Sequence, residues 1–187
     1  LKQLRNGSRH MAGKFSAWLK IGDLTEAHPF ALPLIYLLAT LPIIIFLAYF
    51  RQPIGVADEW SHIARAAQLA DGTVFTEVAE QGQEPQGSID PQFHKMTQEI
   101  HARRHDPLAI LMPDINAYHW TEERILKNYN SSVYIPVPYA ISIAAIHYGQ
   151  YFQYSIVKTL QILNLWNGIV CIVLVAVAMA TATRTIQ

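Results

Sequence analysis

Residues 29–50 read PFALPLIYLLATLPIIIFLAYF, a run of 22 positions without a charged side chain. At about 1.5 Å per residue, a helix of this length covers a hydrocarbon core of about 30 Å. Pro33 and Pro42 kink such a helix without unfolding it, because a bilayer offers the backbone no other hydrogen-bond partners. The run is longer than the apolar region of a signal peptide. It therefore predicts a first transmembrane helix over residues 29–50.

Two further apolar segments follow towards the C-terminal end. Residues 133–150 (VYIPVPYAISIAAIHYGQ) carry two prolines near their start, which a first helical turn tolerates. They predict a second, short transmembrane helix, and residues 158–183 predict a third. In the first half of this third helix, a polar side chain recurs at every third position, as Gln161, Asn164 and Asn167. This polar stripe either bonds to a neighbouring helix or lines a polar cavity.

The distribution of charge predicts the orientation. The chain is 51% hydrophobic and 15% charged, and its 14 basic and 14 acidic side chains cancel, so the total charge does not indicate a nucleic-acid partner. Residues 1–28 carry a net charge of +3, whereas residues 51–132 carry seven basic and twelve acidic side chains. The positive-inside bias predicts a cytoplasmic N-terminal segment over residues 1–28, an extracytoplasmic loop over 51–132 and a short cytoplasmic loop over 151–157.

The predicted fold is therefore an all-α polytopic membrane protein with three transmembrane helices and one large extracytoplasmic loop containing short amphipathic helices. Within the loop, Asp58 is a suitable N-cap for a helix over residues 58–70. The loop is too poor in large apolar residues for an independent core, so we expect its helices to rest on the membrane surface and the transmembrane bundle. The other predictions are an irregular loop over residues 77–92 and short helices over 93–105 and 119–128.

The sharpest local motif is Ala57-Asp58-Glu59-Trp60-Ser61-His62. In a helix, His62 faces Asp58 four positions earlier and Glu59 three positions earlier. A carboxylate beside a histidine just outside the membrane suits a general base or a divalent-cation ligand. The alternative is an N-cap Asp58 followed by a solvated side-chain pair. A zinc-protease interpretation is poor, because Asp58 stands where the His-Glu-x-x-His pattern needs its first histidine.

Two stretches carry a family resemblance. Residues 53–72 (PIGVADEWSHIARAAQLADG) resemble the Pro…Asp-Glu-x-x-His…Arg/Ala…Gly stretch of the bacterial membrane proteins called domain of unknown function 2142. Residues 130–139 (NSSVYIPVPY) resemble that family's Tyr-x-Pro-x-x-Tyr start of a transmembrane helix. An Asp-Glu pair soon after a first transmembrane helix also resembles the GT-C superfamily of membrane glycosyltransferases. Family members are much longer, so the resemblance implies that this sequence is the N-terminal part of such a protein.

The resemblance implies a function on the outer face of the bacterial plasma membrane. A sugar would pass from a polyprenyl-phosphate carrier to a glycan, lipid or protein acceptor of the cell envelope. Asp58 is the implied general base, or alternatively a ligand for a divalent cation, and Glu59 and His62 are the next catalytic candidates. Arg65 and Tyr134 are the candidate substrate-binding residues, with Arg65 as a phosphate partner. Their alternatives are a solvated helical arginine and an aromatic anchor in the membrane interface.

Other patterns give weaker predictions. His94, His101 and His105 would share one helix face, but Arg103 and Arg104 beside them oppose a cation, so we predict no metal site there. From another functional class, the alternative is a small non-enzymatic membrane protein whose outer loop binds a ligand or partner. A transporter is a weaker third option, because the only ionisable candidate inside the predicted spans is His147, near a helix end.

Overall fold

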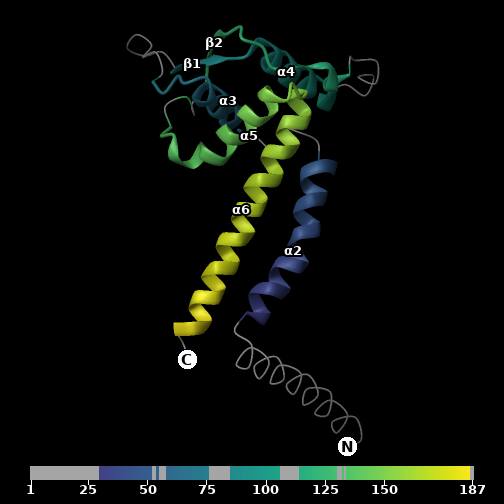
Figure 1. Ribbon diagram of the computed structural model, residues 1–187. Helices are drawn as coiled ribbons and strands as arrows, with labels where there is room; N and C mark the ends of the chain where they lie inside the picture. The colour runs from purple at the N-terminus through teal and green to yellow at the C-terminus, as the bar shows by residue number, and fades with distance from the viewer. Residues whose placement is uncertain are drawn as a thin grey trace, which may run out of the picture. The chain divides into compact units, whose positions relative to one another are not determined.

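The computed structural model describes residues 30–51, 54, 58–75, 85–105, 114–129, 132 and 134–185, without the side chains of 103–105 and 183–185. These residues form helices and one two-stranded sheet (Figure 1). They divide into two compact units, residues 30–43 with 169–185, and the described residues between 44 and 168. In chain order the elements are α2 (Ala31–Phe50), α3 (Glu59–Ala70), β1 (Gln86–Ile89), α4 (Pro91–His105), the 3-10 helix η2 (Ile115–Ala117), β2 (Ile125–Asn128), the 3-10 helix η4 (Val137–Tyr139), α5 (Ala140–Tyr151) and α6 (Ile156–Thr185).

Helices α2 and α6 are the two candidate membrane spans among the described residues. Only 11% of the apolar stretch of α2 and 17% of that of α6 is buried, which is the opposite of the core helix of a soluble protein. Large apolar side chains are exposed along both helices, for example Leu38, Phe46 and Leu174. The first and third predicted helices are thus present as helices, with α6 beginning two residues earlier than predicted.

The second predicted span is not confirmed. Instead of a helix over residues 133–150, the structure has the short η4 followed by α5, which has 12 residues and covers only about 18 Å. Helix α5 begins later than predicted because of a backbone constraint. A helix through Tyr134 would need a hydrogen bond from residue 138 to the Tyr134 carbonyl, and Pro138 has no N–H. That carbonyl accepts from the guanidinium of Arg65 instead.

The core of residues 44–168 is shared between the polar segment and the helices that follow it. Helix α3 is buried on most of its surface, in keeping with its small side chains, such as Ala64 and Ala66. Figure 1 shows α3 close to α5 and to the sheet. The polar segment therefore shares one core with α5 and α6. The largest fully buried apolar side chains of this core are Ile89 from β1, Phe93, Met96 and Ile100 from α4, Ile146 from α5, and Ile156 and Leu160 from α6.

The sheet corrects two predictions. Residues 119–128 do not form a helix: Ile125–Asn128 is a strand, β2, which pairs antiparallel with β1 inside the region predicted as an irregular loop. The register pairs Gln86 with Asn128 and Ile89 with Ile125. Both strands have four residues, and their partners lie far apart in sequence, so neither has a local pattern that predicts it.

Asp90 joins the sheet to α4. Its side chain is 2% exposed. One carboxylate oxygen accepts from the backbone N–H groups of Gln92 (2.7 Å) and Phe93 (3.1 Å), which caps α4. The other accepts from the N–H (2.6 Å) and the hydroxyl (3.1 Å) of Thr121. A buried carboxylate with four donors fixes α4 against the segment that enters β2.

We expect Asp90→Asn to lower the free energy of unfolding by about 1–3 kcal/mol, because an amide replaces charged acceptors with weaker ones and brings two unneeded donors. The measurement is thermal unfolding of the full protein in a neutral detergent. Asp114→Asn is the matched control, since the exposed Asp114 carboxylate also accepts from a nearby N–H (Asn116, 2.9 Å). An Asp90→Asn variant as stable as the Asp114→Asn variant would contradict this role.

Candidate functional site

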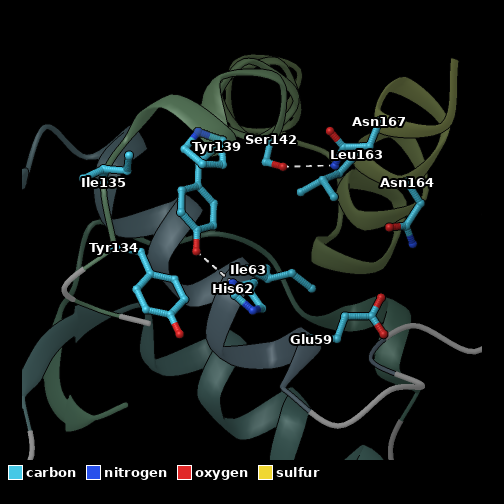
Figure 2. A pocket seen from close by; sticks show the side chains of 11 residues that line it. Glu59, His62, Ile63, Tyr134, Ile135, Tyr139, Ser142, Leu163, Asn164 and Asn167 are labelled. Carbon is cyan, nitrogen blue, oxygen red and sulfur yellow. Dashed lines mark hydrogen bonds between the residues drawn. The ribbon is translucent and has the colours of Figure 1, made fainter. Parts of the chain in front are cut away.

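A cavity of about 750 Å³ lies between α3, the segment around η4, α5 and the first half of α6 (Figure 2). All four belong to the unit of residues 44–168. The cavity has an apolar wall and several polar groups, which is the usual composition of a small-molecule site. Its lining residues are Glu59, His62, Ile63, Tyr134, Ile135, Pro138, Tyr139, Ser142, Leu163, Asn164 and Asn167.

His62 and Tyr139 form a hydrogen-bonded pair in this cavity. The His62 Nδ1 atom lies 2.8 Å from the Tyr139 hydroxyl. A dashed line marks this hydrogen bond in Figure 2. Burial raises the pKa of Tyr139, so the phenol is neutral at physiological pH. The ring of Tyr134 lies 5.7 Å from the His62 ring, centroid to centroid. The imidazole is therefore held in position by two aromatic residues from the segment that precedes α5.

Glu59 and Asp58 stand in different surroundings at the start of α3. The Glu59 carboxylate lines the cavity and accepts from the Arg51 guanidinium at 3.0 Å. Asp58 is the N-cap residue of α3, as predicted, but it is exposed and its carboxylate accepts no hydrogen bond from the N–H groups of the helix. The Asp58 backbone has a φ of 67°, in the left-handed region, which costs a residue other than glycine about 1–2 kcal/mol. Such strain is found preferentially at functional positions.

Arg65 does not line the cavity. Its side chain is 2% exposed, and its guanidinium donates to the carbonyls of Tyr134 and Val74 and to the side-chain oxygen of Gln68, at 2.8–3.0 Å. Burial lowers the pKa of Arg65, as expected for a cation removed from water among neutral acceptors. This geometry favours a positioning role, which places Tyr134 at the cavity, over the phosphate-binding role that the resemblance implies.

The polar stripe of α6 combines both predicted uses. Asn167 donates to the Ser142 hydroxyl of α5 (3.1 Å), and Gln161 donates to the Tyr49 carbonyl of α2 (3.4 Å). These two amides bond to neighbouring helices. Asn164, between them, lines the cavity, and no hydrogen bond of its side chain is found with the described residues. Its amide is therefore available to a ligand.

His94 and His101 of α4 do not line this cavity. The His94 ring contacts the Gln98 amide at 3.1 Å, and burial together with Lys127 lowers its pKa. Within the described ranges, no three side chains of His, Cys, Asp or Glu are grouped so that they could hold a metal ion.

Sequence patterns identified Glu59, His62 and Tyr134 as candidates, and all three line the cavity. Asp58 directly precedes Glu59 in the sequence but does not line the cavity. Tyr139 and Asn164 also line the cavity but were not among the predicted site residues. Both belong to sequence patterns that could have identified them, because Tyr139 is the last residue of the Tyr-x-Pro-x-x-Tyr motif and Asn164 belongs to the polar stripe.

Two exposed apolar helices joined through a folded polar segment with a lined cavity define a helical membrane protein. The chain belongs to the family described as predicted membrane proteins (DUF2142), whose sequence signature matches residues 41–185. The match includes every element that lines the cavity. No curated protein and no solved structure is significantly similar to the chain.

Proposed function

We propose that this chain forms part of a GT-C-like membrane glycosyltransferase, which moves a sugar from a polyprenyl-phosphate carrier to a cell-envelope acceptor. The observation that carries the proposal is the mixed character of the cavity. It places a carboxylate, an imidazole bonded to a phenol, and an uncommitted amide beside apolar side chains such as Ile135 and Leu163. A lipid-linked sugar needs such a combination, since hydroxyl groups and an apolar chain meet in one molecule.

In the proposed reaction the acceptor hydroxyl attacks the anomeric carbon, a general base removes its proton, and the bond to the carrier phosphate breaks. Asp58 is the first candidate base, because its carboxylate is exposed and caps nothing. Glu59 and His62 are the alternatives, since both line the cavity. Arg51, held at Glu59, is a cation next to the cavity that can stabilise the departing phosphate. A divalent cation at Asp58 is a second way to supply that charge.

The same proposal includes a topology of two spans, α2 and α6. Helix α5 would lie in or near the membrane interface, because about 18 Å of helix does not cross a core of about 30 Å. Residues 51–155 would face outward from the bacterial plasma membrane, and both the basic N-terminal segment and Arg184 would be cytoplasmic. An acidic outer segment with basic residues at the inner ends supports this orientation.

Single cysteines at positions 14, 85 and 187, in a Cys171→Ser background, test the topology. We expect a membrane-impermeant maleimide to label position 85 in intact cells, and positions 14 and 187 only after lysis. Labelling of position 187 together with 85 would instead require a third span. Labelling of position 14 in intact cells would reverse the orientation.

The activity itself is tested with membrane vesicles supplied with labelled polyprenyl-phosphate hexoses. We expect labelled sugar to reach an envelope acceptor in membranes that contain the full protein. We expect no transfer in membranes prepared from a strain in which its gene has been deleted. Equal transfer by both membranes would contradict the proposal. It would favour the alternative, a non-enzymatic membrane protein whose outer segment binds a ligand or partner.

A further inference from the structure

A second cavity, of about 570 Å³, lies where the ends of α2 and α6 meet the polar segment, within residues 44–168. Its size falls in the range of small-molecule sites, about 300–1,000 Å³. It is separate from the cavity that holds His62 and Tyr139, and the two have no lining residue in common. Its lining residues are Tyr49, Asn116, Tyr148, Tyr154, Ser155, Lys158, Gln161, Ile162, Leu165 and Trp166.

The cation of this cavity is Lys158, in the first turn of α6. Its Nζ atom lies 3.6 Å from the centre of the Tyr154 ring. No ion pair with a carboxylate is found for Lys158 in the described part of the chain. Its charge is therefore held over an aromatic face, and no carboxylate among the described residues neutralises it, which leaves it able to bind an anionic ligand.

Polar and apolar groups both line the cavity beside Lys158. Ser155, Asn116 and Gln161 supply hydroxyl and amide groups. The apolar part of the lining consists of Ile162, Leu165 and aromatic rings, among which the Tyr148 ring lies 5.5 Å from the Trp166 ring, centroid to centroid. The ligand that fits is an amphiphile with an anionic head.

The position along the helices favours a lipid over a soluble anion. Tyr49 is the penultimate residue of α2, and Lys158 is the third residue of α6, so both lie where the candidate spans end. The hydrogen bond from Gln161 to the Tyr49 carbonyl brings these two ends together. Tyrosine, tryptophan and lysine at the ends of spans are typical of the level of the lipid headgroups.

We propose that this cavity binds the phosphodiester headgroup of an anionic glycerophospholipid, with Lys158 on the phosphate and the acyl chains leaving along Ile162 and Leu165. The proposal needs the chain to be a membrane protein, and it does not depend on the proposed glycosyltransferase activity.

Native mass spectrometry of the full protein in neutral detergent, titrated with phosphatidylglycerol, tests the proposal. We expect Lys158→Gln to weaken binding about fivefold, the factor that corresponds to about 1 kcal/mol per basic side chain at a membrane surface. Lys158→Arg keeps the charge and is expected to bind like the wild type. Lys95→Gln is the matched control, because Lys95 is exposed and also lies over a tyrosine ring, Tyr118, but does not line the cavity.

Each result decides the question. Equal affinity of Lys158→Gln and Lys95→Gln for phosphatidylglycerol would overturn the proposal. If phosphatidylcholine binds as tightly as phosphatidylglycerol, the site does not select lipids with a net negative charge, which would overturn the proposed preference for an anionic lipid. Competition by inorganic phosphate at equal concentration would show that the site takes a free anion and not a lipid. An unchanged unfolding temperature of lipid-free Lys158→Gln shows that a loss of binding is not a loss of folding.

Discussion

Replacing Asp58 with Asn in the full protein is expected to lower the rate of sugar transfer by about 10²–10⁴-fold, the usual contribution of a positioned general base. An amide cannot take the proton of the acceptor hydroxyl at neutral pH. The substitution keeps size and hydrogen-bonding shape, and the Asp58 carboxylate caps nothing in α3, so the fold should be preserved. The assay is the transfer of labelled sugar in membrane vesicles, with the amount of folded protein measured in parallel.

Glu59→Gln and His62→Gln serve as comparisons in the same assay. Activity of Asp58→Asn within twofold of the wild type would exclude Asp58 as the base. A large loss in Glu59→Gln or His62→Gln, with Asp58→Asn active, would move the base to a residue that lines the cavity. A loss in all three would indicate that the acid–base machinery is shared along the first turn of α3.

Replacing Arg65 with Met is expected to have the largest effect on stability, about 3–5 kcal/mol, because the carbonyls of Tyr134 and Val74 both lose the guanidinium that donates to them. The side-chain oxygen of Gln68 keeps one donor, the Tyr129 hydroxyl. Methionine fills much of the volume but cannot donate. For a chain of this size the unfolding temperature should fall by about 6–20 °C. Thermal unfolding in detergent, followed by circular dichroism, measures the shift.

Arg51→Met is the matched control for this prediction. The Arg51 ion pair with Glu59 is partly exposed, with side-chain exposures of 39% and 18%, so its loss should cost at most about 1 kcal/mol. Arg65→Lys should fall between the two variants, because one ammonium group cannot reproduce the planar fork of a guanidinium. An Arg65→Met variant that unfolds within 2 °C of the wild type would refute the positioning role.

The helices were predictable wherever their signal is local. The apolar runs gave α2 and α6 to within two residues at each end, and the pattern after Asp58 gave α3. The sheet was not predictable, because β1 (QGSI) and β2 (ILKN) are short and gain stability only from each other. The start of α5 was misplaced because the hydropathy of residues 133–150 does not record that Arg65 takes the Tyr134 carbonyl.

In the candidate site, too, the residues that are close in sequence were predictable and those brought together by packing were not. Asp58, Glu59 and His62 lie within five positions, so their spacing on a helix could be read directly. The partner of His62 is Tyr139, 77 positions later, and only the packing of α5 against α3 brings the two together. Asn164 belonged to a recognisable polar stripe, but the choice between a helix contact and a cavity wall depends on rotation of α6, which sequence does not fix.

Binding of a lipid-linked sugar in the cavity between α3, α5 and α6 is tested most directly by photo-crosslinking of a photoactivatable polyprenyl-phosphate sugar to the full protein in membranes, with the modified peptides mapped by mass spectrometry. If the sugar binds there, adducts will fall within residues 59–63, 134–142 or 163–167, and unlabelled donor will suppress them. Adducts confined to other segments, or adducts that unlabelled donor does not suppress, would contradict binding in this cavity.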